Sequence, residues 1–279
     1  EDHLDFHKDM EDYCDAKGKL FGICDTGCVN ADDPWTPRLI KNATCRLMCY
    51  SAKSAADLTA EHIALHSDGV EFDAVSGGER AHVRLGIPGA FTVYNALGVI
   101  QAAQALGLPL EKIAAALSTA QGVKGRAEVV PTPGKDYTVL IDYSHTPDSL
   151  ENILKTVRGF CRGHVIAVFG CGGDRDPFKR PIMGGIAARL ADVAVVTSDN
   201  PRTEDPYKIL RQILAGMQDT ETPYEVIESR VSAIGRAMEL AQKDDVIVLC
   251  GKGHETYQEV NHVKHHMDER EIVAEYFNK

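Results

Sequence analysis

The sequence predicts an α/β protein whose second half is built around a mostly parallel sheet. Short apolar segments recur in that half, and stretches with helical periodicity separate them. The predicted strands are 137–142, 165–170, 193–197 and 245–250, and the predicted helices are 147–159, 180–191, 206–217 and 231–242. Strands that are apolar almost throughout are typical of a parallel sheet covered by helices on both faces.

The first half follows a different pattern. Residues 9–22 have apolar side chains at helical spacing, which predicts a helix. Short alternating segments between 43 and 85, broken by glycine-containing turns, predict a hairpin-like antiparallel sheet. Two further helices are expected at 90–106 and 109–120, the second with Pro109 near its start.

The pattern changes at Gly125, so we expect two domains, 1–125 and 126–279. A net charge of −11 argues against nonspecific nucleic-acid binding, which needs basic surface. No apolar run reaches the length of a membrane span, and no basic-then-apolar leader opens the sequence. These features predict a cytoplasmic protein with reduced thiols.

Four of the eight cysteines form two pairs of equal spacing. Cys24 and Cys28 are separated by three residues, and so are Cys45 and Cys49. Four thiolates are the right number for a structural zinc ion, although the spacing is not the common one. The alternative is that they are small core residues without a metal, and the sequence leaves both open.

Polar, glycine-containing loops follow all four predicted strands of the second half. They are 142–147, 170–176, 198–202 and 251–255. Ligands of open parallel sheets gather beyond the carboxyl ends of the strands. Arg175 and Arg202 offer forks for carboxylates, whereas Asp199 and Glu255 offer counter-charges for ammonium groups. No dinucleotide fingerprint occurs. The loops therefore predict a site for an amino acid that carries an additional carboxylate.

Several of these loops resemble motifs of the Mur ligase family. The segment Asp199–Arg202 resembles the diaminopimelate-recognition motif of the muramoyl-tripeptide synthetases, and Gly251–Glu255 resembles another of their signatures. Three more segments agree with motifs of these enzymes, namely 3–7, 142–147 and 172–176. The resemblance runs in the same order along the chain from residue 2 to about 275. It implies a Rossmann-like C-terminal domain (126–279) and part of the central α/β ATPase domain (1–125).

The resemblance also implies roles for residues of the first domain. Lys17 falls where these enzymes carry a carbamylated lysine, whose anionic oxygens suit Mg²⁺, and His3 falls on a metal-associated histidine. Asn95 matches a position that contacts the adenine of ATP, but Thr92 departs from the asparagine often found at its position. Taken without the resemblance, these residues are a solvated helix lysine, a surface histidine and a polar residue at a helix start.

In the second domain the resemblance assigns catalytic and binding residues. Arg126 and Asp142 match positions that face the phosphate-transfer centre, and His145 matches a nucleotide-contacting position. Read alone, they are a hinge ion pair and a helix cap. The incoming amino acid is expected to contact Arg175, Asp199, Asn200, Arg202, Gly251 and Glu255.

The reaction implied is ATP-dependent amide formation in peptidoglycan synthesis. Meso-diaminopimelate is added to UDP-N-acetylmuramoyl-L-alanyl-D-glutamate through an acyl phosphate. Arg202 favours diaminopimelate over lysine, because a site built for the distal carboxylate rejects an analogue lacking it by about 10⁴-fold. The alternatives are a diaminopimelate-binding module without catalysis, a lysine-adding relative, and a polyglutamate- or cyanophycin-forming ligase, which would lack the Asp199–Arg202 motif.

The 279 residues contain no P-loop. The Gly-Lys pairs at 18–19, 134–135 and 251–252 lack the following Ser or Thr and the upstream glycine in register. We therefore expect the chain to lack the N-terminal part of such an enzyme and to be inactive alone. A complete enzyme is expected to be a monomer, whereas an incomplete first-domain sheet would expose an edge that favours self-association.

Overall fold

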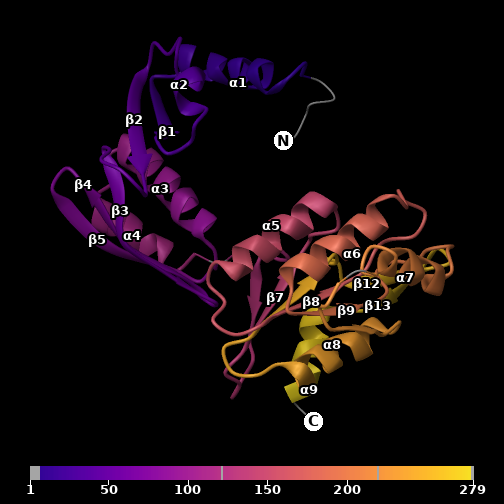
Figure 1. Cartoon of the computed structure of the whole chain (residues 1–279). Coiled ribbons are helices and arrows are strands. Elements are labelled where there is room, and N and C mark those ends of the chain that lie inside the picture. Colours follow the sequence, from indigo (N-terminus) through magenta and orange to yellow (C-terminus); the bar gives the residue numbers. More distant parts are fainter. Residues whose placement is uncertain (1–6, 121, 219, 278–279) are drawn as a thin grey trace. The chain divides into compact units, whose positions relative to one another are not determined.

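The computed structural model describes residues 7–120, 122–218 and 220–277, which form two compact units (Figure 1). Unit 1 comprises the described residues up to Ala64, with Val70–Leu85 and Ala90–Ala120. Unit 2 comprises the described residues from Gly122 onward, together with two short earlier segments, Leu65–Gly69 and Gly86–Gly89. The sequence pattern gave no sign that these two segments belong with the second half.

Unit 1 contains a five-stranded sheet in the order β1-β2-β3-β4-β5. Its strands are β1 (Thr26–Asn30), β2 (Arg46–Ser51), β3 (Leu58–His66), β4 (Gly69–Ser76) and β5 (Glu79–Leu85). Its helices are α1 (Met10–Gly18), the 3-10 helix η1 (Lys19–Gly22), α2 (Thr36–Leu39), α3 (Ala90–Ala105) and α4 (Leu110–Leu117). The helix predicted at 9–22 is confirmed as α1 followed by η1.

The prediction of an antiparallel sheet between 43 and 85 is partly wrong. β4 and β5 pair antiparallel, as expected. However, β2 runs parallel to both β1 and β3. Alternation of apolar and polar residues reports that a strand is half-buried, but it carries no information about the direction of a neighbour that is distant in sequence.

Unit 2 contains a six-stranded sheet in the order β10-β9-β8-β11-β7-β6. The strands are β6 (Glu128–Val130), β7 (Thr138–Asp142), β8 (Val165–Phe169), β9 (Val193–Val196), β10 (Tyr224–Val226) and β11 (Val246–Cys250). Neighbours from β10 to β7 are parallel, and only β6 at the edge is antiparallel. The predicted parallel sheet is therefore confirmed.

Helices cover both faces of this sheet, as predicted. They are α5 (Pro147–Arg158), α6 (Lys179–Leu190), α7 (Pro206–Leu214), α8 (Arg230–Leu240) and α9 (Glu269–Phe277). Figure 1 shows α5 and α6 on one side of the strands and α8 and α9 on the other. Two apolar clusters fill the layers: Leu154 and Met183 belong to the first, and Ile234 and Val273 to the second.

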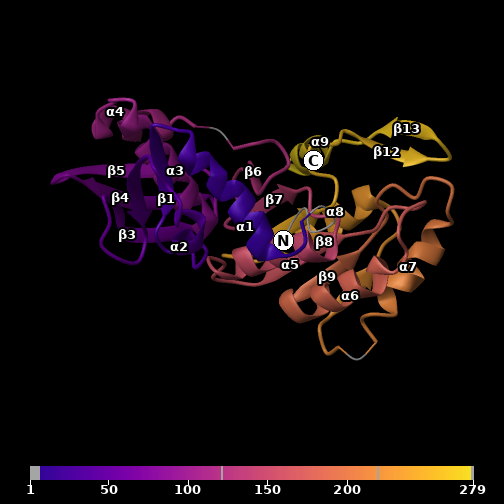
Figure 2. The same ribbon diagram turned by 90° about the horizontal axis from the view of Figure 1, so that it is seen from above.

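Several elements were not predicted from the sequence. The short edge strands β6 and β10 have three residues each, too few for a periodic pattern. A hairpin of β12 (Tyr257–Val260) and β13 (Val263–His266) lies at the outer edge of unit 2 (Figure 2), and α9 follows it. In the part of the chain that the structure describes, no helix has the length and apolar character needed to cross a membrane.

Candidate amino-acid site at the strand ends of unit 2

The loops after β7, β8, β9 and β11 meet around a cavity of about 550 Å³. They meet because the parallel strands end in register: Asp142 pairs with Cys250, and Phe169 pairs with Val196. All six residues predicted for the amino-acid site line the cavity, namely Arg175, Asp199, Asn200, Arg202, Gly251 and Glu255. His145, which was predicted to contact the nucleotide, lines it too. Asp176, Phe178, Lys179 and Ile182 line it as well, although the sequence did not single them out.

Glycine is required where two of these loops touch. A Cβ atom on Gly173 would lie 1.9 Å from the carbonyl oxygen of Pro201. Gly251 has a φ of +115°, and a Cβ atom there would lie 2.6 Å from Oδ2 of Asp199. Larger residues at either position would push the loops apart. The glycines noted in the sequence therefore allow close approach between loops.

A buried arginine clamps the second loop to the third. Arg180, at the start of α6, is fully buried and directs its guanidinium to Glu204 through two hydrogen bonds of 2.8 and 3.0 Å. Arg180 also donates to the carbonyl of Gly172 at 3.1 Å. The hydrogen bonds from Arg180 lower the pKa of Glu204 to about 2. The clamp fixes the separation of the loops that carry Arg175 and Arg202.

The depressed pKa of Glu204 predicts an acid-sensitive fold. The folded state binds the Glu204 proton less readily than the unfolded chain, so the stabilisation is present above about pH 4.5 and is lost as pH falls toward 2. In wild type we expect a loss on the order of 2 kcal/mol over that window from this group. Glu204→Gln should flatten this part of the profile. Urea unfolding between pH 2 and 6 measures the free energy of unfolding of both proteins. The prediction is contradicted if wild type and Glu204→Gln show the same dependence of stability on pH.

Arg202 is held in an uncommon backbone conformation by the hairpin. Its φ is +51°, in the left-handed region that non-glycine residues rarely adopt. Its N–H donates to the carbonyl of Glu259 at 3.0 Å, and its own carbonyl accepts from Asn261 at 2.7 Å. Nη1 of Arg202 donates to the carbonyl of Gly173 at 2.8 Å, and Nε lies 3.4 Å from the Glu259 carboxylate. The guanidinium therefore has a defined position beside the cavity.

The acidic side of the cavity contains a buried hydrogen-bond network. Nδ2 of Asn200 donates to Oε2 of Glu255 at 2.9 Å. Oδ1 of Asn200 accepts from Nζ of Lys252 at 2.7 Å and from the N–H of Glu259 at 2.8 Å. Lys252 also donates to Oε2 of Glu255 at 2.9 Å. Asp199 is nearly buried, and its carbonyl accepts from the side chain of Gln258.

A second buried arginine lies beneath the loops. Arg230 and Glu269 are both inaccessible to solvent and form an ion pair with a distance of 2.8 Å between Nη2 and Oε1. Nη2 of Arg230 also donates to the carbonyl of Cys250, and Nη1 lies 3.5 Å from the carbonyl of Ser198. This arginine joins the ends of β9 and β11 and thereby supports the third and fourth loops.

Asp142, at the end of β7, is committed to hydrogen bonds within the loops. Its Oδ2 accepts from the N–H of Ala127 at 2.8 Å, and its Oδ1 accepts from the hydroxyl of Ser144. Arg126, next to Ala127, is exposed and lies over the ring of Tyr143 at 5.6 Å. His145 is exposed, and its Nδ1 lies 2.8 Å from the carbonyl oxygen of Tyr143. Asp142 thus anchors the turn that presents Arg126.

The residues expected in unit 1 lie on two helices. Lys17 is exposed near the end of α1, with Nζ 5.1 Å from the centre of the Tyr13 ring. Asn95 is exposed on α3. Thr92, on the same helix, is buried, and its hydroxyl has no partner among the described residues. His3 lies outside the described residues, so its metal-binding role stays a prediction.

No cluster of three or more His, Cys, Asp or Glu residues that could hold a metal ion occurs within 7–120, 122–218 and 220–277. Cys24, Cys28, Cys45 and Cys49 are free thiols near the first two strands of unit 1. Burial and a hydrogen bond from Cys45 raise the pKa of the Cys24 thiol.

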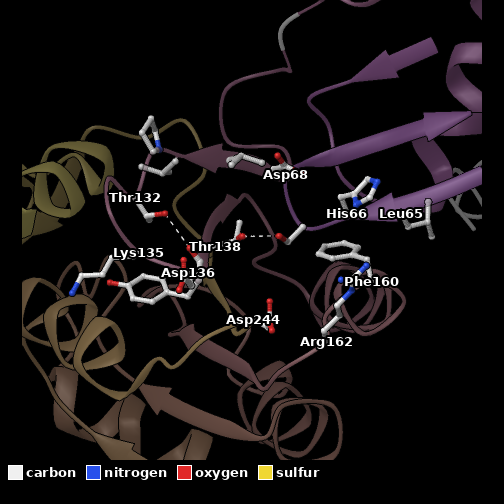
Figure 3. A pocket seen from close by; sticks show the side chains of 15 residues that line it. Leu65, His66, Asp68, Thr132, Lys135, Asp136, Thr138, Phe160, Arg162 and Asp244 are labelled. Atoms are coloured by element: carbon white, nitrogen blue, oxygen red, sulfur yellow. Dashed lines mark hydrogen bonds between the residues drawn. The ribbon is translucent and has the colours of Figure 1, made fainter. Parts of the chain in front are cut away.

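A second cavity of unit 2, of about 400 Å³, lies at the other end of the strands (Figure 3). Thr138, the first residue of β7, and Asp244, two residues before β11, line it. Thr138 donates to the hydroxyl of Ser67 at 2.7 Å, which ties segment Leu65–Gly69 to unit 2. Lys135 and Arg162 lie on opposite sides in Figure 3, and Arg162 is the one arginine among the described residues of its lining, whereas two arginines line the first cavity.

Two protein-family models match the chain, in the order along the sequence that the motifs predict. The model of the Mur ligase middle domain matches residues 1–103, and that of the Mur ligase glutamate ligase domain matches residues 125–253. The chain belongs to the Mur ligase family. Its fold class, an α/β protein with Mur ligase middle and C-terminal domains, is therefore as predicted.

The similar proteins include curated enzymes of one named activity. A UDP-N-acetylmuramoyl-L-alanyl-D-glutamate–2,6-diaminopimelate ligase of Clostridium botulinum is 46% identical over 99% of this Mur ligase chain and 57% of its own length. The enzyme of that name from Clostridioides difficile is 44% identical over 100% of the chain and 58% of its own length. A solved structure of that name superposes with a TM-score of 0.78 at 34% identity, covering 99% of the chain and 58% of its own length. The chain thus spans a little over half the length of these relatives.

Two residues around the cavity escaped the sequence argument although they contact residues that it named. Lys252 lies inside the Gly251–Glu255 segment, and its position between two glycines was the available signal. Glu259 follows shortly after that segment and carried no signal, because its contact with Arg202 depends on the hairpin. Both come from the segment that folds back along Asp199–Arg202.

Proposed function

We propose that this Mur ligase chain contributes the amino-acid site of a ligase that joins meso-diaminopimelate to UDP-N-acetylmuramoyl-L-alanyl-D-glutamate in peptidoglycan synthesis. The named activity of the relatives at 44–46% identity supports this proposal. The observation that carries it is the cavity in unit 2, where Arg175 and Arg202 lie with Asp199 and Glu255 around one space. A diamino dicarboxylic acid has two groups of each sign to match them.

The residues of the cavity suit the two ends of that substrate. The arginines would bind carboxylates, and Arg202 would take the distal one that lysine lacks. Asp199 and Glu255 would bind ammonium groups and hold the substrate in place. The attacking amine, once it has lost a proton, would form the amide bond and displace phosphate from the acyl phosphate. We assign Arg126, Asp142 and His145 to the side that faces the nucleotide, with residues 1–125 and 126–279 as the two domains.

The proposed reaction uses ATP and Mg²⁺ in the cytoplasm, and it serves cell-wall growth, cell shape and division. Mg²⁺ would neutralise phosphate charge during phosphoryl transfer. Lys17, which the structure describes, would supply the oxygen atoms of its carbamate as ligands for Mg²⁺. The described residues include no group of three or more His, Cys, Asp or Glu side chains that could hold the ion with it. We also propose that Asn95 contacts adenine and that the complete enzyme is a monomer.

A diaminopimelate-binding module without catalysis is the second candidate. It is favoured by the cavity, whose lining residues all belong to unit 2. A lysine-adding ligase is less compatible, because lysine has no distal carboxylate to accept hydrogen bonds from the guanidinium of Arg202, which lines the cavity. The lysine-adding ligase differs from the other two candidates in the amino acid that it binds.

Isothermal titration calorimetry with the 279-residue chain tests the proposed amino-acid site. We expect meso-diaminopimelate to bind to one site and L-lysine to bind at least about 100-fold more weakly, because Arg202 loses its partner. Lysine binding that equals or exceeds diaminopimelate binding would refute the assignment. Added ATP and Mg²⁺ should yield no ADP if the chain only binds.

A further inference from the structure

The buried lysine of the fourth loop has no role in the assignments above. Lys252 is 0% exposed, and its ammonium donates to Asn200 and Glu255. Leaving a lysine charge in a protein interior is costly unless partners compensate it. Here both partners are residues that line the cavity, whereas Lys252 itself does not line it. The lysine therefore stands directly behind the acidic side of the site.

The contacts of Lys252 decide which end of the Asn200 amide faces the cavity residues. An asparagine amide accepts at one end and donates at the other. Lys252 and the N–H of Glu259 both donate to Oδ1, so Nδ2 must point the other way, and it donates to Glu255. Asn200 is thus occupied by three hydrogen bonds to the protein, and its amide works as a connector between Lys252 and Glu255.

The same contacts leave one oxygen of Glu255 for a ligand. Oε2 accepts from both Asn200 and Lys252. Among the described residues, no side chain or backbone group donates to Oε1 of Glu255. The carboxylate is therefore held at one oxygen by Asn200 and the buried Lys252, which fixes its position and leaves its other oxygen available at the cavity wall.

We propose that Lys252 is a positioning residue that fixes Glu255, through direct contact and through Asn200, for recognition of a substrate ammonium group. This inference rests on the proposed amino-acid site. It predicts that Lys252 governs the recognition of amines, whereas Arg202 governs that of the distal carboxylate. The two effects separate with three ligands: meso-diaminopimelate, L-lysine, which lacks the distal carboxylate, and pimelate, which lacks both amines.

The test is calorimetric titration of these ligands into the 279-residue chain and its Lys252→Met variant. We expect the Kd for meso-diaminopimelate to rise about 30-fold, on the order of losing one partner of a buried charged hydrogen bond. The preference for diaminopimelate over pimelate should nearly vanish, while the preference over lysine should persist. General damage to the fold would instead reduce both preferences together.

Lys264→Met is the matched control. Lys252 and Lys264 both place Nζ near the ring of Tyr257, at 5.3 and 4.0 Å, but Lys264 lies on the exposed strand β13 and does not line the cavity. We expect its Kd to change by no more than about twofold. If Lys252→Met unfolds, Lys252→Gln, which keeps an N–H donor without the charge, carries the same comparison.

The outcomes separate the two proposals. A folded Lys252→Met protein with the Kd values and both preferences of wild type overturns the role of Lys252. Equal loss of both preferences also overturns it, because the lysine would then only support the fold. Failure of the wild-type chain to bind meso-diaminopimelate overturns the proposed amino-acid site itself, and the role of Lys252 with it.

Discussion

Arg202→Ala should raise the Kd for meso-diaminopimelate on the order of 100-fold and abolish the preference over lysine. The guanidinium already has a fixed position, because Gly173 and Glu259 contact it and the backbone of Arg202 is held at a φ of +51°. A fixed fork loses little entropy when it binds a carboxylate. The substitution therefore removes a prearranged contact, and calorimetry with both amino acids measures its loss.

Two control variants distinguish the contribution of the planar guanidinium geometry from that of the positive charge. Arg202→Lys keeps the positive charge but cannot bind a carboxylate through two parallel hydrogen bonds, so it should recover only part of the affinity. Arg211→Ala removes an exposed arginine of α7 and should leave the Kd unchanged. The role of Arg202 is refuted if Arg202→Ala, correctly folded, still prefers diaminopimelate over lysine as wild type does.

Arg230→Met should be the most destabilising of the substitutions considered. It removes the partner of Glu269 in a pair that is completely inaccessible to solvent. Oε2 of Glu269 has no hydrogen-bond partner among the described residues even in wild type. Breaking such a pair on one side costs about 3–5 kcal/mol. Urea unfolding followed by far-UV circular dichroism measures the loss, with Trp35 fluorescence as a separate report on unit 1.

The double variant Arg230→Met/Glu269→Leu distinguishes an unpaired charge from lost packing. Replacing both members of a buried pair by apolar residues is often nearly neutral. We therefore expect the double variant to recover most of the stability that Arg230→Met loses. A double variant as unstable as the single one would show that the pair matters through the contacts of Arg230 with Cys250 and Ser198.

The loss of folding stability caused by Arg230→Met should also depend on pH. Burial raises the pKa of Glu269 in the folded protein, so the folded state takes up this proton more readily than the unfolded chain. Without Arg230 the charge is uncompensated, and protonation relieves it. The stability of the variant relative to wild type should therefore improve as the pH is lowered toward the ordinary range of a glutamate.

The parallel sheet of unit 2 was predictable because its strands are apolar on both faces and alternate with amphipathic helices. The same reasoning placed the four loops at one edge, since the ends of parallel strands meet there. It failed for β2 and β3, which pair in parallel where a hairpin pattern was expected. Strand direction there is set by partners distant in the chain, and local alternation does not record it.

The sequence by itself determined the family, the layered architecture of unit 2 and part of the lining of its cavity, because each depends on local patterns and motif order. Only the tertiary structure decided what those residues do for one another. It turned Asn200 into a connector, placed Lys252 behind Glu255, and brought Glu259 to Arg202. These contacts join residues far apart in the chain, and their charges are paired by folding rather than by spacing. The proposed preference for an amino acid with a second carboxylate, which the sequence suggested through one arginine, thus depends on a hairpin that holds that arginine in place.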